Sequence, residues 1–261
     1  MNPVKLLVTG GLGFIGSNFI RHMLNSYSDI RITNVDNLSV GSNPANLKDV
    51  RKDSRYRFVR GDITNLRPLT RLVKDVDGVV NIAAETHVDR SISNPEPFVK
   101  SNTIGTYTIL EAVRKSNPSA KIIQVSTDEG YGDIVEGSFR EDAPLKPSSP
   151  YASSKAAADM YVVAYHRTYG LHAMITRCTN NFGPYQHPEK LIPKTIVRAH
   201  LNLPVPVYGK GEQVRDWIYV QDHCMALNQV MEKGKSGEIY NISAGNEMSN
   251  LQVDSGATWK I

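Results

Sequence analysis

A glycine-rich loop near the start of the chain is the feature that most restricts its fold. The stretch VTGGLGFIGS follows a short apolar run, and Gly10, Gly11, Gly13 and Gly16 satisfy both the G-x-G-x-x-G and the G-x-x-G-x-x-G spacing. Glycines let such a loop turn tightly, approach a pyrophosphate and present helix-terminal amide groups to it. The stretch therefore predicts a strand, a phosphate-binding turn and the start of a helix.

Short apolar runs rich in β-branched residues alternate with amphipathic stretches along the chain. The runs lie at residues 5–9, 31–35, 56–59, 78–83, 121–125 and 172–176, and helical periodicity is clearest at 15–24, 97–115 and 150–169. Strands that alternate with helices pair in parallel through right-handed crossovers. The sequence thus predicts an α/β fold with a Rossmann-like, doubly wound parallel sheet.

The character of the chain changes after residue 177. Five prolines divide the following segment into short pieces: Pro184, Pro188, Pro193, Pro204 and Pro206. This pattern predicts a nucleotide-binding domain at residues 1–177 and a smaller C-terminal substrate lobe at 178–261, without a second independent domain. The final stretch LQVDSGATWKI lacks apolar periodicity, so we expect a truncated or non-native end and a partial lobe.

Composition narrows the classes of partner. The 30 basic and 26 acidic residues give a net charge of +4 without a basic run, which favours an anionic small molecule over nucleic acid. No apolar stretch is long enough to span a bilayer, and no signal-peptide pattern precedes the first strand. Cys178 and Cys224 have neither metal-ligand nor disulfide-framework spacing. We therefore expect a cytoplasmic protein with no metal, nucleic-acid or membrane partner.

Two acidic residues end the second and third predicted strands. Asp36 follows Gly16 by 20 residues, the position from which a carboxylate accepts hydrogen bonds from an adenosine ribose and repels a 2′-phosphate. We therefore predict NAD as the cofactor in preference to NADP. Asp62, in VRGDIT, is expected to contact the adenine, although a simple turn residue is nearly as good an interpretation.

A tyrosine and a lysine later in the chain form a candidate chemical pair. Tyr151 and Lys155, in PSSPYASSKAAAD, are four residues apart and so share one face of a helix. An ammonium beside a phenol stabilises the phenolate, so we expect Lys155 to lower the pKa of Tyr151 toward neutrality. Such a spacing also arises by chance on surface helices. Here it follows a dinucleotide loop and a strand that ends in Ser126 and Thr127.

The stretch VSTDEGYGD places two carboxyls, Asp128 and Glu129, directly after a buried strand. Unpaired charges at such a position are costly. Taken alone, the pair fits a helix cap, a solvated turn or an ion pair with a basic residue.

The chain resembles the dTDP-glucose 4,6-dehydratases of the extended short-chain dehydrogenase/reductase family, from Lys5 to about Asn250. The resemblance rests on VTGGLGFIGS, NIAAETHVDRSISNPEPFVKSNTIGTY, VSTDEGYGD, PSSPYASSKAAAD, NNFGPYQHPEKLIP, VYGKGEQVRDWIYVQDH and GEIYNISAGNE. It implies a NAD-dependent hydro-lyase that converts dTDP-glucose to dTDP-4-keto-6-deoxyglucose in deoxysugar, rhamnose-type biosynthesis. The substrate would be a nucleotide-diphosphate hexose and the enzyme a homodimer.

The resemblance also implies a role for each group at the reacting centre. Tyr151, aided by Thr127 and Lys155, would take the proton of the hexose 4-hydroxyl while carbon 4 gives a hydride to NAD. The resulting ketone acidifies carbon 5, so Glu129 would remove its proton while Asp128 protonates the leaving 6-hydroxyl. Hydride return to carbon 6 leaves no net consumption of NAD.

The family's binding positions carry over onto this chain residue by residue. Arg215 is the most persuasive of them, because a guanidinium fork suits a diphosphate, whereas Lys190 could equally be a solvated surface residue. His87, in ETHVDRS, is expected to be structural. The NAD positions are Gly10, Gly13, Phe14, Ile15, Gly16, Asp36, Asn37, Asp62, Ile63, Ala83, Ala84, Ser101, Tyr151, Lys155 and Asn181; the nucleotide-sugar positions are Thr86, Asn180, Lys190, Leu191, Pro206, Tyr208, Arg215 and Asn250.

The expected homodimer would form through the stretches 97–115 and 150–169. These match the helices through which relatives pair as a two-fold four-helix bundle. Ile104, Ile109, Ala156 and Ala164 are candidates for its apolar seam.

Three other functions compete with the dehydratase. A UDP-sugar 4-epimerase or decarboxylase would keep the glycine loop and the Tyr–Lys pair but generally lacks the acid pair. A GDP-mannose dehydratase would keep the Glu but not the preceding Asp. A non-catalytic NAD-binding protein is the third, and the choice of thymidine or uridine is left open. The chain departs from the family at Gly130, usually β-branched, and at the Ala-Ser-Ser after Tyr151.

Overall fold

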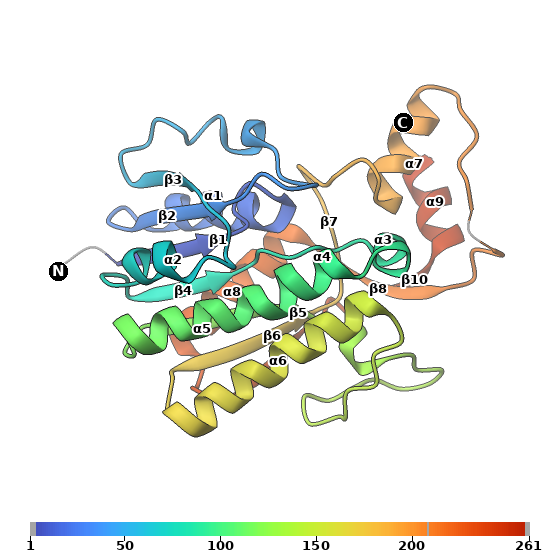
Figure 1. The fold of residues 1–261 in the computed structure, drawn as a ribbon. Helices are drawn as coiled ribbons and strands as arrows, with labels where there is room; N and C mark the ends of the chain where they lie inside the picture. The colour runs from blue at the N-terminus through green and yellow to red at the C-terminus, as the bar shows by residue number, and fades with distance from the viewer. Residues whose placement is uncertain (1–3, 208, 259–261) are drawn as a thin grey trace.

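The computed structural model describes residues 4–207 and 209–258. Seven strands form the main sheet: β1 (Lys5–Thr9), β2 (Arg31–Asp36), β3 (Tyr56–Arg60), β4 (Gly78–Asn81), β5 (Lys121–Thr127), β6 (Ala173–Cys178) and β9 (Ile239–Ile242) (Figure 1). Their order is β3-β2-β1-β4-β5-β6-β9, and every neighbouring pair is parallel. The predicted doubly wound, Rossmann-like sheet is confirmed, and β9 is an edge strand that the sequence pattern missed.

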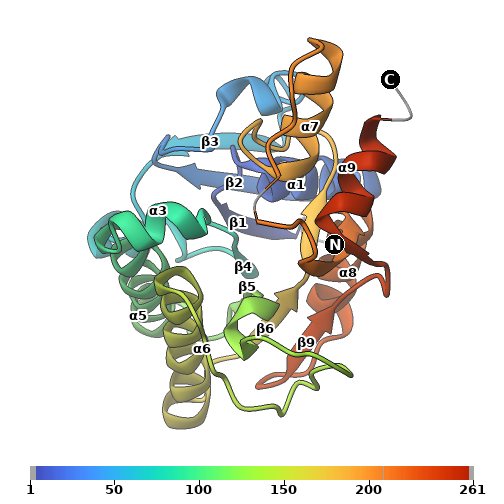
Figure 2. The ribbon, with the colours of Figure 1, turned by 90° about the vertical axis from the view of Figure 1, so that its right-hand side faces the viewer.

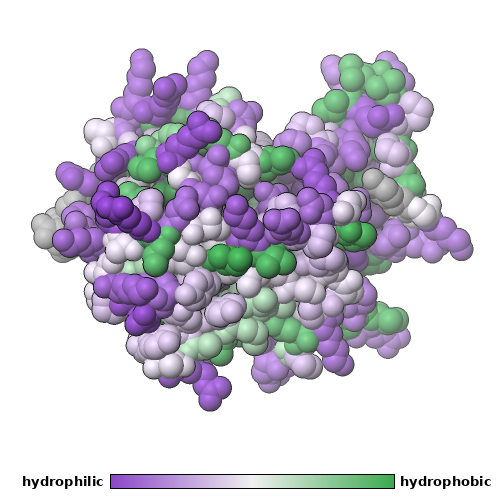
Figure 3. Space-filling model, in the orientation of Figure 1, coloured by the Kyte–Doolittle hydropathy of each residue, from purple (hydrophilic) through white to green (hydrophobic). Residues whose placement is uncertain are grey.

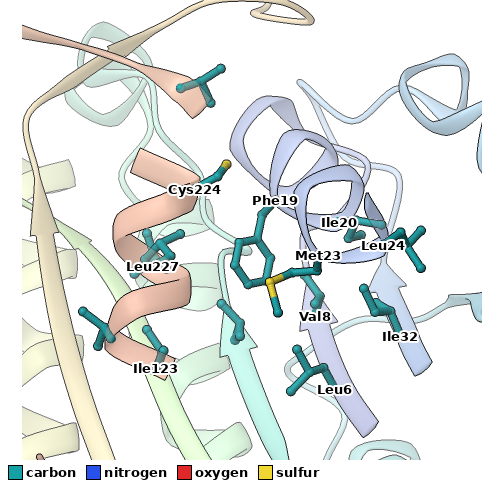
Figure 4. Packing of buried hydrophobic residues seen from close by; sticks show 14 of the residues in the cluster. Leu6, Val8, Phe19, Ile20, Met23, Leu24, Ile32, Ile123, Cys224 and Leu227 are labelled. Carbon is teal, nitrogen blue, oxygen red and sulfur yellow. The ribbon is translucent and has the colours of Figure 1, made fainter. Parts of the chain in front are cut away.

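Helices cover both faces of this sheet. α1 (Phe14–Ser26) and α8 (Val220–Lys233) lie on one face, and α2 (Leu66–Leu72), α5 (Gly105–Ser116) and α6 (Pro150–Tyr169) lie on the other (Figure 2). Strand β1 is buried on both sides, which explains its continuous apolar run. Leu6 and Val8 belong to the core with α1 and α8, and Leu7 belongs to the core beneath the other three helices. Figure 4 shows Phe19 of α1 and Leu227 of α8 in the first of these cores.

Local signals fix both ends of α6. The Ser149 hydroxyl accepts a hydrogen bond from the Ala152 amide at 3.1 Å, and Pro150 occupies the first turn, where its missing N–H costs nothing. Gly170 ends the helix in the left-handed region, with φ of 68°. The helix therefore has the bounds that the sequence predicted, and Tyr151 lies in its first turn.

The helix predicted at residues 97–115 is interrupted by a wider turn. α4 (Glu96–Phe98), a π-helical segment (Val99–Ile104) and α5 follow one another. Within that segment Asn102 is 1% exposed; its Oδ1 accepts from the Glu85 amide at 2.9 Å and its Nδ2 donates to the Glu85 carbonyl at 3.0 Å. Single π turns are frequent at functional sites. Here the turn ties the chain just past β4 to the helical layer.

A smaller three-stranded sheet and two helices form the lobe beside the main sheet. The lobe contains β7 (Asn180–Phe182), β8 (Val214–Tyr219) and β10 (Glu247–Ser249), in the order β10-β8-β7, with α7 (Leu191–His200) and α9 (Asn250–Thr258) packed on each other. Figure 1 shows α7 and α9 at the right of the sheet. The domain boundary after residue 177 stays a prediction. Beyond it, α8 and β9 still pack on the main sheet, so the lobe does not include every element after that residue.

None of the helices in the described part of the chain combines the length and the apolar character needed to cross a membrane. Nowhere in residues 4–207 and 209–258 do three His, Cys, Asp or Glu side chains meet in a way that could hold a metal ion. Cys178 and Cys224 are buried free thiols.

Candidate active site

One cavity of about 610 Å³ lies at the carboxyl ends of the strands of the main sheet and extends to the lobe. Ligands of doubly wound sheets bind at this edge. Asp62 and Asp128 do not line the cavity, and Tyr208 lies outside the described residues. The predicted residues that do line it are Gly10, Gly13, Phe14, Ile15, Gly16, Asp36, Asn37, Ile63, Ala83, Ala84, Thr86, Ser101, Thr127, Glu129, Tyr151, Lys155, Asn180, Asn181, Lys190, Leu191, Pro206, Arg215 and Asn250.

The glycine loop is packed too closely for side chains. Gly10 has φ of 68°, and a Cβ on it would lie 2.6 Å from the Cα of Ala83. A Cβ on Gly16 would lie 2.3 Å from the Gly10 carbonyl oxygen. Bare backbone at Gly10 and Gly16 therefore lines the cavity, as close approach of a pyrophosphate requires. The loop fits NAD on its own geometry.

Asp36 is 4% exposed and lies at the end of β2 on the cavity wall. Its Oδ2 accepts from the Leu12 amide at 3.0 Å, and its Oδ1 accepts from the Leu38 amide at 2.9 Å and the Ser42 hydroxyl at 2.8 Å. These bonds fix the carboxylate beside the glycine loop, where the ribose position was predicted.

Asp62 is placed differently from Asp36. Its Oδ1 accepts from both the backbone amide and the hydroxyl of Thr64, each at 2.8 Å. The side chain does not reach the cavity wall. These hydrogen bonds fit the turn interpretation of Asp62, and its contact with adenine stays a prediction.

The acid pair begins a 3₁₀ turn, Asp128–Tyr131, directly after β5. The Thr127 hydroxyl caps this turn: it accepts from the Glu129 amide at 3.3 Å and donates to Asp128 Oδ1 at 3.2 Å. Burial raises the pKa of Asp128, against the Thr127 hydrogen bond and the charge of Arg215. Burial also raises the pKa of Glu129, and the neighbouring Asp128 raises it further, while Arg215 and Lys190 oppose. Both carboxyls of the turn therefore hold a proton to higher pH than a free carboxyl does.

Tyr151 and Lys155 lie on the buried face of α6, with 8% and 4% exposure. Lys155 Nζ donates to the carbonyl of Val125 at 2.6 Å, and burial lowers the pKa of Lys155. Burial and the negative charge of Glu129 raise the pKa of Tyr151 well above its usual value, although a hydrogen bond with Thr127 opposes them. The expectation that Lys155 brings the pKa of Tyr151 toward neutrality is therefore wrong for the protein alone, because burial and Glu129 raise that pKa.

The lobe contributes two basic residues, Lys190 and Arg215, to the cavity wall. Lys190 Nζ donates to the Thr86 carbonyl at 3.1 Å, so it bridges the lobe and the segment after β4. The exposed Arg215 on β8 donates from Nη1 to its neighbour's carbonyl. The charges of both residues lower the pKa of Glu129. This places both cations within electrostatic reach of the acid turn and makes a solvated surface role for Lys190 a poor description.

Three acidic residues of the cavity were missed by the sequence analysis: Glu85, Asp89 and Glu189. Burial raises the pKa of Glu85. The backbone amide and carbonyl of Glu85 are both hydrogen-bonded to the Asn102 side chain. Glu189 accepts from Arg90 at 2.6 Å and lies 3.9 Å from His87 Nε2. Glu85 directly follows Ala83 and Ala84, which were singled out, so proximity in sequence could have found it. Glu189 could not be found that way, because its partners lie about 100 residues earlier in the chain.

Comparisons with known proteins place the chain among nucleotide-sugar enzymes. A family model described as GDP-mannose 4,6 dehydratase matches residues 7–261. The low-salt glycan biosynthesis protein Agl12 of Haloferax volcanii is 50% identical over 250 residues, which cover 96% of this chain and 80% of that protein. The dTDP-glucose 4,6-dehydratase of Salmonella typhimurium is 44% identical over 270 residues, which cover 96% of this chain and 74% of that protein.

A solved structure agrees with these sequence relatives. The crystal structure of dTDP-glucose 4,6-dehydratase from Bacillus anthracis in complex with NAD superposes with a TM-score of 0.92 at 48% identity, covering 97% of this chain and 79% of that chain. Both the fold and the sequence are therefore shared over nearly the whole chain. The chain belongs to the dTDP-glucose 4,6-dehydratase family, within the extended short-chain dehydrogenases/reductases.

Proposed function

We propose that this chain catalyses the NAD-dependent dehydration of dTDP-glucose to dTDP-4-keto-6-deoxyglucose. The observation that carries the proposal is the acid turn. Glu129 opens onto the cavity that also contains Tyr151 and the glycine loop, and Asp128 lies beside it. An oxidation at carbon 4 needs only the tyrosine and the cofactor, whereas elimination of water needs an acid and a base as well. The product suits deoxysugar, rhamnose-type biosynthesis.

The first step uses the groups at the end of β5 and the start of α6. Tyr151 takes the proton of the 4-hydroxyl, and the Thr127 hydroxyl shares the hydrogen bond. Lys155 holds positive charge in the same buried region and favours the phenolate. Bound NAD supplies a hydride acceptor for carbon 4 and later returns the hydride to carbon 6. The pKa of Tyr151, raised by burial and by Glu129, makes the phenolate a strong base once formed.

The second step uses the two carboxyls in different roles. Burial and Asp128 raise the pKa of Glu129, and Arg215 and Lys190 oppose them; because Glu129 lines the cavity, we assign to it the removal of the proton of carbon 5. Asp128 is set back from the cavity wall, and burial favours its neutral form, so it donates a proton to the leaving 6-hydroxyl. A carboxylate and a carboxylic acid side by side match the needs of an elimination.

The binding roles follow the shape of the cavity. The glycine loop and Asp36 take the NAD pyrophosphate and ribose, with Phe14, Ile15, Asn37, Ile63, Ala83, Ala84, Ser101 and Asn181 around them. Arg215 takes the sugar-nucleotide diphosphate, because a guanidinium offers two parallel donors to phosphate oxygens. Thr86, Asn180, Lys190, Leu191, Pro206 and Asn250 complete the substrate side.

One incubation tests the reaction. The chain would be supplied with NAD and, in separate samples, dTDP-glucose, UDP-glucose or GDP-mannose, and the 4-keto product would be followed by its absorbance in alkali. We expect dTDP-glucose to be converted fastest. Interconversion of UDP-glucose and UDP-galactose without a 4-keto product from any sample would instead favour an epimerase. Binding of NAD without any turnover would favour the non-catalytic alternative.

We also propose that the chain forms a homodimer through α5 and α6. Five large apolar side chains near these helices are between 42% and 49% exposed: Val99, Ile104, Tyr107, Met160 and Tyr161. Figure 3, in the orientation of Figure 1, shows apolar residues gathered across the middle of this face. Ile109 and Ala156 are buried inside the protomer at 1% and 8% exposure, so these two expected seam residues are wrong.

A cytoplasmic location is the remaining part of this proposal. Cys178 and Cys224 are both free thiols in the structure. Thiols persist in reducing compartments, and the cytoplasm also supplies NAD and nucleotide sugars. Detection of the activity in the soluble cytoplasmic fraction of fractionated cells would test it.

A further inference from the structure

Three charged side chains lie together in the interior behind the acid turn. Lys155 and Asp159 of α6 and Arg177 of β6 are 4%, 1% and 2% exposed. Arg177 Nε donates to Asp159 Oδ2 at 2.9 Å. Lys155 precedes Asp159 by one helical turn and so shares its face of the helix. Asp159 therefore pairs directly with Arg177, and Lys155 is a second buried cation near the same carboxylate, an arrangement that is unfavourable unless every charge is balanced.

Few ionisable groups surround Lys155. Tyr151 and Asp159 come from its own helix, Arg177 and Cys178 come from β6, and β5 contributes the Val125 carbonyl. Burial lowers the pKa of Lys155, and the charge of Asp159 is the largest effect opposing it, with Cys178 second. Among the nearby charges, that of Asp159 therefore favours the ammonium form of Lys155 most, beside the hydrogen bond to the Val125 carbonyl.

Arg177 extends the same group to the acid turn. Its guanidinium carbon lies 4.7 Å from the ring centroid of Tyr131, the last residue of the turn that begins at Asp128. The Tyr131 hydroxyl in turn donates to Asn241 Oδ1 on β9 at 2.8 Å. A buried chain of contacts thus runs from α6 through β6 to the underside of the turn.

We infer that Asp159 is a positioning residue of this site: its carboxylate keeps Lys155 in the ammonium form and holds Arg177 beneath the turn that carries the acid pair. Asp159 does not line the cavity, so it acts on the site through its neighbours, chiefly these two cations. With Asp159 ionised and Tyr151 neutral the group has one net positive charge, which a Tyr151 phenolate cancels. The inference rests on the proposed dehydration, and it links the oxidation groups to the elimination groups.

Direct titration of Lys155 tests the charge balance without any turnover. The ε-carbons of lysine would be labelled with ¹³C, and the Lys155 signal would be assigned from Lys155→Arg and followed by NMR against pH. Asp159→Asn should lower the midpoint by about one pH unit or more, a tenfold loss of proton affinity. Asp159→Glu should restore most of it. Arg177→Met, which removes a cation and keeps the carboxylate, should not lower it. An unchanged midpoint in Asp159→Asn would overturn the inference.

Loss of folding must be separated from loss of charge balance. Asp159→Asn leaves Arg177 buried without its anion, so the double variant Asp159→Asn/Arg177→Met provides a second comparison against Arg177→Met alone. Its Lys155 midpoint should again be lower. Glu111→Gln is the matched control, because Glu111 is a buried carboxylate between α5 and α6 that pairs with Arg114 and Lys115. It should destabilise the fold and leave the Lys155 midpoint unchanged.

Partial reactions with dTDP-glucose test the positioning itself. In single turnovers, Asp159→Asn should move the alkaline loss of carbon 4 oxidation to lower pH. Arg177→Met should slow solvent deuterium exchange at carbon 5 by about tenfold more than it slows oxidation, because it loosens the turn and spares Lys155. Equal slowing of both would overturn the role of Arg177. If the parent chain fails to convert dTDP-glucose, the proposed function fails, and the Lys155 titration still decides the charge balance.

Discussion

At the scale of single residues, Asp128 and Glu129 are adjacent in sequence but meet different surroundings. Both pKa values are raised by burial. Asp128 shares a hydrogen bond with Thr127 behind the cavity wall, whereas Glu129 opens onto the cavity and is influenced by Lys190. This asymmetry supports the proposed roles of Glu129 as the base and Asp128 as the acid.

Substitutions of the acid turn should separate the steps of the reaction. Glu129→Gln should still oxidise carbon 4 but lose exchange at carbon 5, because an amide cannot take a proton, so reduced cofactor should accumulate. Asp128→Asn should keep the oxidation and slow the loss of water. Each loss should be about a hundredfold or more, equivalent to about 3 kcal/mol of barrier. The measurement is single-turnover absorbance at the reduced-cofactor band, with deuterium exchange at carbon 5 followed by mass spectrometry.

Tyr151→Phe is the matched comparison, since it removes only a hydroxyl and should block even the first hydride transfer. If Glu129→Gln turned over at the parental rate, the acid pair would be a structural turn, and the epimerase would become the better interpretation. The comparison requires that all variants bind NAD equally.

We predict that Asp36 sets the preference between NAD and NADP. Its fixed carboxylate would accept hydrogen bonds from the ribose hydroxyls and repel a 2′-phosphate, so the parent should bind NAD more tightly than NADP. Asp36→Ala should narrow that preference, mostly by weakening NAD, because three local hydrogen bonds to the carboxylate are also lost. Titration calorimetry with both dinucleotides measures the difference between their affinities. Equal affinities in the parent would disprove the assignment.

At the scale of elements, α5 and α6 are joined by a buried carboxylate. Glu111 of α5 accepts from Arg114 at 2.6 Å and from the Tyr165 hydroxyl of α6 at 2.9 Å, and it lies 2.8 Å from Lys115 Nζ. Hydrogen bonds from Arg114 are the main reason that the pKa of Glu111 falls to about 2. The ionised form is therefore preferred far more strongly in the folded chain than in the unfolded one.

Glu111→Gln should lower the stability of the fold in a pH-dependent way. A carboxyl whose pKa is depressed on folding stabilises the protein above its unfolded value, which is near 4.5, and that contribution disappears as the pH falls toward about 2. We expect a cost of about 1–3 kcal/mol near neutral pH, the usual range for hydrogen bonds to a charged group. Thermal or urea unfolding of both proteins between pH 7 and pH 2 measures it. A difference that stayed constant over this range would show that the charge is not the cause.

The sequence predicted some elements better than others, for physical reasons. α6 was predicted to the residue because its cap, its first-turn proline and its terminal glycine are all local signals. Strand β9 was missed because it has four residues and is stabilised by β6, about 60 positions earlier in the chain. The Asp159–Arg177 pair was missed for a similar reason, since no short-range pattern reveals that a helix and a strand face each other.

At the scale of the whole molecule, the apolar face over α5 and α6 is the strongest sign of assembly. Exposed apolar patches on monomeric proteins are small, and larger ones mark interfaces. Sedimentation of the parent at micromolar concentration should give a dimer mass, and Ile104→Glu should give a monomer, because it places a charge in the seam. Met225→Glu, a change at a 50% exposed position on α8 across the sheet, is the control and should leave the dimer intact. A monomeric parent would contradict the proposal.

The strand order has a consequence for redesign. The winding of the chain reverses between β1 and β4, so successive crossovers leave to opposite faces and a crevice opens between them without help from any particular side chain. The crevice for the cofactor thus follows from the order in which the strands are connected. The acid turn, in contrast, consists of only four residues at the end of one strand. Replacing the residues of that turn should change the reaction that follows oxidation of the sugar, while NAD binding and the oxidation itself are retained.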